Sequence, residues 1–122
     1  MIHQGSGAGP IRADGTFVTG KVGRDVDLDA AKEAARLTGL QLLAILRAQL
    51  GSLDRVARVV KTLGMVNCAP GFNRTPAVID GCSELLIDVF GDAGRGARSA
   101  VGMAELPFDI AVEIELVVEV TD

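Results

Sequence analysis

Apolar residues recur every three or four positions between residues 28 and 50, which is the spacing of one helix face. Asp27 stands where a helix N-cap belongs, and Gly51 follows as a natural stop. The pattern predicts an amphipathic helix over residues 28–50, with its apolar stripe formed by Ala31, Ala34, Thr38, Leu42, Ile45, Leu46, Ala48 and Leu50.

A second helix is expected from about residue 75 to residue 90. Thr75 is predicted to cap it, with Pro76 at the first helical position and Gly91 as the stop. One face of this helix is expected to carry Ile79, Cys82, Leu86 and Val89.

Strict alternation predicts strands elsewhere. Val56 to Met65 alternates and is rich in β-branched residues, and residues 109–120 alternate between apolar side chains and glutamates. The stretch from Arg98 to Pro107 is also expected to form a strand, followed by a turn at Pro107 and Phe108. Two short strands are expected before the first helix, one within residues 1–15 and one over residues 16–23.

Two amphipathic helices require an apolar sheet face to cover, so this element order predicts an α+β two-layer sandwich with both helices on one face of a mixed sheet. No linker or repeat divides the chain, and we expect one domain over residues 1–122. The other sheet face would carry Val117 beside Glu113 and Glu115, which a chain of this length cannot cover. We therefore expect copies of the chain to associate through that face and cover it.

Composition narrows the choice of partners. The net charge of −4 and the scarcity of aromatic residues, four Phe only, disfavour nucleic acid. No apolar run is long enough to span a membrane, and the first residues lack the pattern of a signal peptide. Cys68 and Cys82 have no metal-finger spacing and are expected to pack in the core as reduced thiols, so we expect a cytoplasmic protein.

Local motifs for cofactors are weak. The glycine-rich segment at residues 5–10, GSGAGP, could cradle a phosphate, but no full strand precedes it and no helix follows it directly, so a tight turn is favoured. His3 is the single histidine and has no paired acid or nucleophile. We therefore expect no metal and no cofactor.

Arg98 and Glu113 are the remaining candidates for chemistry. An arginine at the start of a strand is either a solvated surface residue or the binding group for an anionic ligand. Glu113 is either solvated or, beside a surface that an oligomer buries, a carboxylate that needs a partner or a task. The residues alone leave both alternatives open.

Three motifs in fixed order give a more specific indication. They are R-S-x-V from Arg98, A-x-L-P from Ala104 and E-I-E from Glu113, all after two helices, while Ser6 to Pro10 is similar to an S-G-Q-x-P turn. Over about residues 5–120 the chain resembles the reactive intermediate/imine deaminase family, also called Rid or YjgF-like.

The resemblance implies a chorismate-mutase-like fold, with the family's N-terminal strand shortened, assembled as a homotrimer with three clefts between subunits. It implies hydrolysis of reactive 2-imino and 2-enamino acids to 2-oxo acids and ammonia, as in a 2-iminobutanoate/2-iminopropanoate deaminase, without metal or cofactor. The expected partners are a small carboxylate-bearing imine or enamine and further copies of the chain, with no nucleic acid and no membrane.

The resemblance also assigns site residues. Arg98 falls on the catalytic arginine and Glu113 on the glutamate that positions water. The implied substrate-binding positions are Ser6, Gly7, Asp80, Ser99 and Ala100, where Asp80 stands at the family's cleft asparagine. An arginine suits a 2-imino acid because its planar fork binds a carboxylate through two hydrogen bonds.

Two other functions stay open at this point. The same fold could serve as a non-catalytic trimeric module that binds small carboxylates or proteins in these clefts. A mutase or ribonuclease activity is the third alternative, and the acidic charge argues against the ribonuclease.

Overall fold

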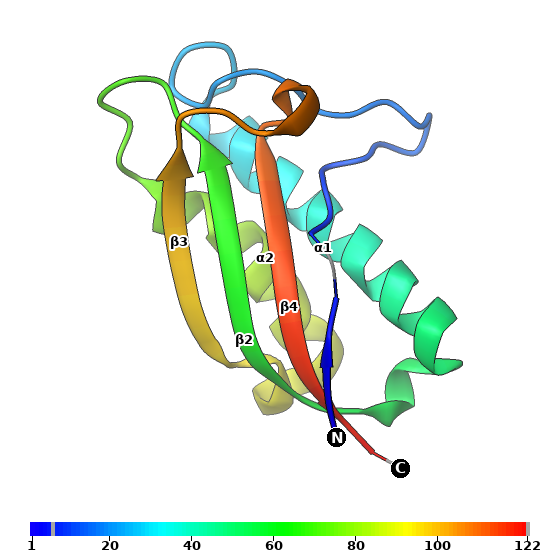
Figure 1. The fold of residues 1–122 in the computed structure, drawn as a ribbon. Helices are drawn as coiled ribbons and strands as arrows, with labels where there is room; N and C mark the ends of the chain where they lie inside the picture. Colours follow the sequence, from blue (N-terminus) through cyan, green and yellow to red (C-terminus); the bar gives the residue numbers. More distant parts are fainter. Residues whose placement is uncertain (6, 122) are drawn as a thin grey trace.

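The computed structural model describes residues 1–5 and 7–121 and shows two layers, with both long helices against one face of a sheet (Figure 1). Three short 3-10 turns join the main elements: η1 (Leu53–Arg55), η2 (Gly91–Gly94) and η3 (Pro107–Asp109). The helices and strands are β1 (Ile2–Gln4), α1 (Leu28–Leu50), β2 (Val56–Asn67), α2 (Thr75–Phe90), β3 (Ala97–Met103) and β4 (Val112–Val120).

The sheet has the strand order β1-β4-β2-β3. β4 is antiparallel to both β1 and β2, whereas β3 is parallel to β2 and is reached through α2. A parallel pair requires a crossover connection, and α2 supplies it. The predicted α+β sandwich with a mixed sheet and two helices on one face is confirmed.

The first helix begins and ends as its sequence predicts. The Asp27 carboxylate accepts a hydrogen bond from the backbone N–H of Ala30 at 2.8 Å, which satisfies a donor that the first turn would leave open. At the other end Gly51 adopts the left-handed conformation, with φ at 84°, and its N–H reaches the carbonyl of Arg47.

The start of the second helix differs from the prediction. Arg74 occupies the N-cap position without a side-chain hydrogen bond, and Thr75 is already helical, so Thr75 is not the cap. Its hydroxyl instead donates to the carbonyl of Ala100 on β3 at 3.0 Å. The reason is tertiary: the edge strand supplies an acceptor for this hydroxyl, which ties the beginning of α2 to β3.

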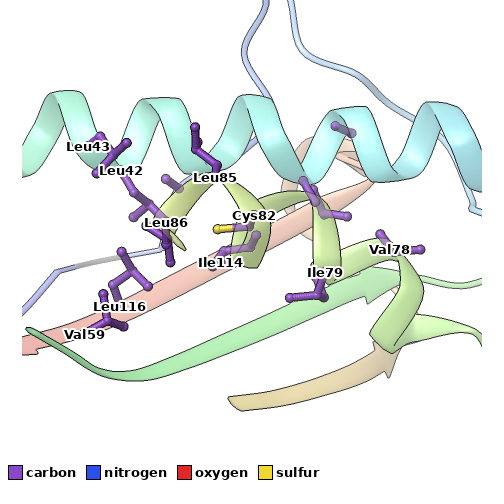
Figure 2. Close-up of a cluster of buried hydrophobic side chains, with 14 of the residues drawn as sticks. Leu42, Leu43, Val59, Val78, Ile79, Cys82, Leu85, Leu86, Ile114 and Leu116 are labelled. Carbon is purple, nitrogen blue, oxygen red and sulfur yellow. The ribbon is translucent and has the colours of Figure 1, made fainter. Parts of the chain in front are cut away.

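The core lies between the helices and the sheet, where Leu42 and Leu43 of α1 and Ile79, Cys82 and Leu86 of α2 meet the sheet side chains Val59, Ile114 and Leu116 (Figure 2). Ile79 packs directly onto Gly64 of β2, where a Cβ would overlap the isoleucine. Burying each large aliphatic side chain stabilises the fold by about 1.5–3 kcal/mol.

Strand β4 alternates as predicted: its even-numbered residues are buried and its odd-numbered residues are half-buried. Strand β2 does not alternate strictly. Its pairing with β4 shifts between Val56 and Arg58 and again between Val59 and Lys61, so the buried positions are Val56, Val59 and Thr62. A bulge adds one residue to a strand without a clear mark in the sequence, and the predicted alternation is therefore wrong over this half of β2.

The predicted strand over residues 16–23 is absent. Only single bridges form there, such as Thr19 to Ile110 and Val22 to Cys68. Gly15, Gly20 and Gly23 have φ angles of 86°, 113° and 97°, and these turns bend the backbone too often for a ladder to extend.

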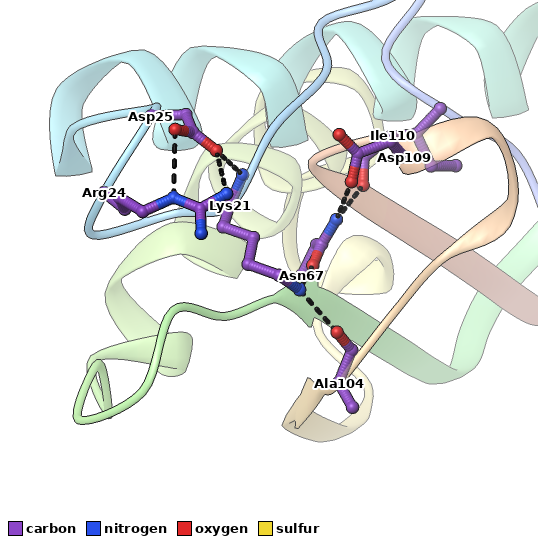
Figure 3. A network of polar contacts seen from close by, with 7 residues as sticks. All are labelled: Lys21, Arg24, Asp25, Asn67, Ala104, Asp109 and Ile110. Atoms are coloured by element: carbon purple, nitrogen blue, oxygen red, sulfur yellow. Dashed lines mark hydrogen bonds and ion pairs between the residues drawn. The ribbon is translucent and has the colours of Figure 1, made fainter.

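This loop is held to the end of β2 by polar contacts around Asn67 (Figure 3). The amide oxygen of the fully buried Asn67 accepts from Lys21 Nζ at 2.9 Å, and its nitrogen donates to the Asp109 carboxylate and the Ile110 carbonyl, each at 3.1 Å. Lys21 also donates to the carbonyl of Ala104 at 2.5 Å. The network therefore fastens the loop and the β3–β4 connection to the same strand end.

None of the helices in the described residues combines the length and the apolar character that crossing a membrane requires.

Candidate functional site

Arg98 lies on β3, the edge strand, and its side chain reaches toward α2. Its Nη1 donates to Asp80 Oδ1 at 2.7 Å and to Ser83 Oγ at 3.2 Å. The same side of β3 faces the core at Ala100 and meets Thr75 at Gly102. Arg98 therefore belongs to the helix side of the sheet, with 29% of its side chain exposed.

A shallow groove of about 200 Å³ runs beside this arginine. The groove is lined by two arginines, two hydroxyl side chains and two glycines beside one apolar side chain: Thr62, Ser83, Ile87, Gly94, Arg95, Gly96 and Arg98. Because β3 is the last strand of the sheet, the groove opens at a free edge. The arrangement can bind a small ligand that accepts hydrogen bonds.

Glu113 lies on the opposite face of the sheet. It is half-buried between the buried Val112 and Ile114, and its partner in the β2 ladder is Met65. Gly7 packs directly against its carboxylate, where a Cβ would overlap the oxygen atom. The N-terminal segment therefore helps to position this carboxylate and requires a glycine to do so.

One chain does not bring Arg98 and Glu113 together. Arg98 pairs with Thr62 of β2, which pairs with Leu116 of β4, three residues beyond Glu113. At ordinary strand spacings the two backbones are separated by about 10 Å along the strands and about 10 Å across them. Their side chains also point to opposite faces.

The other predicted site residues divide between these two places. Asp80 contacts Arg98 directly, and Gly7 contacts Glu113. Ser99 is half-buried beside Leu63 on the sheet face opposite the helices, called the open face below. Ala100 faces the core, and its carbonyl accepts a hydrogen bond from the Thr75 hydroxyl. Ser6 lies outside the described residues.

Sequence reasoning missed Ser83 and Thr62 as neighbours of Arg98. Ser83 follows Asp80 by three residues on α2, a spacing that places both on one helix face. That spacing could have identified Ser83 once Asp80 was chosen. Thr62 is 4% exposed and lies opposite Arg98 in the β2–β3 ladder, a pairing that only the register gives.

The remaining reactive side chains have structural roles. Burial raises the pKa of the Cys82 thiol to about 12, and the nearby Arg98 guanidinium only partly opposes this, so Cys82 is a core residue and not a nucleophile. His3 Nε2 makes a simple hydrogen bond with Gln49 Oε1 at 2.7 Å. Within residues 1–5 and 7–121, no three or more His, Cys, Asp or Glu side chains gather as a metal site would require.

Comparison with known proteins identifies the family. Residues 3–120 match the family described as "YjgF/chorismate_mutase-like, putative endoribonuclease". The chain belongs to the YjgF family. It is also 42% identical to "Protein TCP17" of Trypanosoma cruzi over 118 residues, which cover 96% of this chain and 74% of that protein. The family suggested by the sequence motifs is thereby confirmed.

Solved structures of this family share the fold. Atu1372 of Agrobacterium tumefaciens, of unknown function, is 44% identical with a TM-score of 0.95, covering 98% of this chain and 78% of its own. A "putative endoribonuclease" of Shewanella oneidensis is 28% identical with a TM-score of 0.93, covering 98% and 79%. YyfA of Yersinia pestis, a Rid family protein of unknown function, is also 28% identical, with a TM-score of 0.65 over 98% and 80%.

At equal sequence identity, the backbone follows the Shewanella structure more closely than the Rid protein. The fold is therefore shared, while the overall backbone agrees with these two structures to different extents. Roles carried over from Rid proteins need support from this chain's own contacts.

Proposed function

We propose that this protein hydrolyses imines and enamines, including 2-imino acids, to carbonyl compounds and ammonia in clefts between copies of the chain. The observation that carries the proposal is that Arg98 and Glu113 lie on opposite faces of the sheet within one chain. Arg98 lines a groove at the edge of the sheet, and Glu113 lies on the sheet face opposite the two long helices (Figure 1). If a neighbouring copy brings its open face to this edge, one arginine and one glutamate share a cleft.

The open face supports such an association because it is partly apolar. Leu63, Met65 and Val117 are half-buried there, and 39% of Val101 is exposed. These side chains lie in adjacent rows of β3, β2 and β4. Burying them against another copy would remove apolar surface from water, which favours a closed oligomer such as the homotrimer implied by the Rid resemblance.

The chemistry needs one acid–base group and one binding group. Glu113 removes a proton from water as the water oxygen bonds to the imine carbon, which gives a tetrahedral carbinolamine. Glu113 passes this proton to the imine nitrogen. The hydroxyl proton then moves to the nitrogen through the same carboxylate as the C=O bond forms, and the C–N electron pair leaves with ammonia, so no oxidant or reductant is involved. Arg98 holds the polar end of the substrate and thereby fixes the carbon near the water.

Ammonia release tests the proposal. 2-Iminobutanoate is generated in situ as a short pulse by excess dehydratase, with no amine reagent that would itself displace ammonia from the imine, and the ammonia released above the uncatalysed rate is followed. Arg98→Ala should lower kcat/KM at least about 100-fold, since two charge-assisted hydrogen bonds of about 1.5–3 kcal/mol each are lost. Arg98→Lys should recover only part of this because it keeps the charge without the fork.

Arg36→Ala serves as the matched control, since Arg36 pairs with Glu33 on the same helix at 3.6 Å and is absent from the Arg98 groove. It should keep full activity. If Arg98→Ala releases ammonia as fast as the unmodified protein, Arg98 has no part in catalysis and the deaminase proposal fails at this site.

A non-catalytic binding module is the second candidate. It is favoured by the Arg98–Asp80 pair at 2.7 Å, which already satisfies part of the guanidinium that a substrate carboxylate would use. In that case small polar molecules would bind at the Arg98 groove, and the ammonia assay would give only the uncatalysed rate.

A further inference from the structure

Asp80 and Arg98 present an acceptor and donors side by side at the groove. Their shared contact joins Oδ1 to Nη1, with side-chain exposures of 45% and 29%. In the described part of the chain, the side-chain hydrogen bonds of this pair use only those two atoms and Ser83 Oγ. The second carboxylate oxygen and the remaining guanidinium N–H groups are therefore open to a ligand.

The charge of the pair is zero, which changes what Arg98 can recognise. A lone arginine favours an anion, but here a carboxylate already lies in contact with the guanidinium. A second carboxylate at the same groove would be repelled by Asp80 at close range, and its nearest guanidinium is already paired. The other cation of the groove, Arg95, is also paired, with Asp92 at 3.3 Å, so neither arginine leaves an uncompensated positive charge for an anion. Ser83 and Thr62 add hydroxyls, and these bind neutral groups without compensating a negative charge.

A primary amide fits this pair better than a carboxylate does. Its oxygen accepts from the Arg98 fork, and its NH₂ group donates to the free oxygen of Asp80. Both partners are then satisfied without adding charge to the cleft.

We propose that Asp80 determines substrate charge, so that the protein prefers imines that bear a neutral polar group, above all a carboxamide, over 2-imino acid anions. The inference rests on the proposed function in taking Arg98 as the group that binds substrate. Asp80 acts here as a specificity residue. It does not take part in the proton transfers.

Binding of two matched product analogues tests this without relying on turnover. The probes are 2-oxobutanoate and 2-oxobutanamide, which differ only in the carboxylate and the amide. Titration calorimetry should show the amide bound at least about tenfold tighter than the acid, the size of effect expected for one partly exposed charge in contact with the site. Asp80→Asn should make 2-oxobutanoate bind about tenfold tighter and bring the ratio of amide affinity to acid affinity to one or below.

Asp88→Asn is the control, since it makes the same change on the same helix but lies in the groove toward α1, with Asp29 and Lys32. It should leave both affinities unchanged. The inference is overturned if the unmodified protein binds the acid as tightly as the amide, if Asp80→Asn leaves the ratio unchanged, or if neither probe binds. Failure of ammonia release together with the expected affinity ratio would remove the deaminase activity and leave the charge preference standing.

Discussion

Gly7 is the residue on which the position of Glu113 depends most directly. A Cβ at Gly7 would overlap the Glu113 carboxylate, so Gly7→Ala should push this side chain away from its position. Displacing a catalytic group by about 1 Å costs on the order of 100-fold in rate. We expect ammonia release to fall toward that extent, with an unchanged melting temperature because the atom displaced is the end of a flexible side chain.

Gly5→Ala is the matched control for this change, since a Cβ at Gly5 meets nothing within 4 Å. It should keep the activity and the melting temperature of the unmodified protein. Equal activity in both glycine variants would show that the carboxylate of Glu113 does not need its present position.

At the scale of residues, the sequence motifs named Arg98, Glu113 and Gly7, and the structure gives Gly7 and Glu113 a direct contact. The contact between Asp80 and Arg98 could not be predicted, because the two residues are 18 positions apart on a helix and a strand. The hydrogen bond from the Thr75 hydroxyl to the Ala100 carbonyl could not be predicted for the same reason. Such contacts depend on how α2 lies over β3, which no local spacing encodes.

The crossing of α1 and α2 depends on two helix glycines. A Cβ at Gly81 would overlap the backbone carbonyl of Lys32, whereas one at Gly39 would meet the Leu85 side chain at 2.9 Å and the Cys82 sulfur at 3.2 Å. Gly81→Ala should therefore lower the free energy of unfolding by about 1–3 kcal/mol, since a backbone cannot move aside as a side chain can.

Gly39→Ala is the comparison that isolates packing, because both variants gain the same helix propensity of about 1 kcal/mol. Urea denaturation should rank Gly39→Ala as the more stable variant. The reverse order would mean that the helices are free to move apart at Gly81.

At the scale of elements, strong hydrophobic periodicity is sufficient to predict helices and strands. Residues 28–50 form α1 and the glutamates of β4 alternate as predicted. Prediction failed where backbone geometry decides the outcome. The two register shifts in β2 and the left-handed glycines of residues 15–23 carry no hydrophobic pattern, so a strand was expected where a loop forms.

For the whole molecule, the uncovered sheet face should hold the oligomer together. Leu63→Glu places a charge among the apolar side chains of that face, and a buried unpaired carboxylate is strongly unfavourable. Light scattering should give three times 12.7 kDa for the unmodified chain and a single 12.7 kDa chain for the variant.

Leu40→Glu makes the same change on α1, where 41% of the leucine is exposed, and should leave the oligomer intact. A monomeric unmodified protein at micromolar concentration would remove the shared cleft. At this scale the sequence predicted association from the half-covered sheet, but it gave no indication that Arg98 and Glu113 lie on opposite faces.

The central claim is that each site takes Arg98 from one copy and Glu113 from another, and mixed oligomers test it most directly. Arg98→Ala and Glu113→Gln chains, each inactive alone, are unfolded together in equal amounts, refolded, and assayed for ammonia release. In a closed ring about one site in four then combines an intact arginine with an intact glutamate, so we predict recovery of about a quarter of the unmodified activity. Mixed oligomers that form but stay as inactive as either variant alone would contradict a site shared between copies.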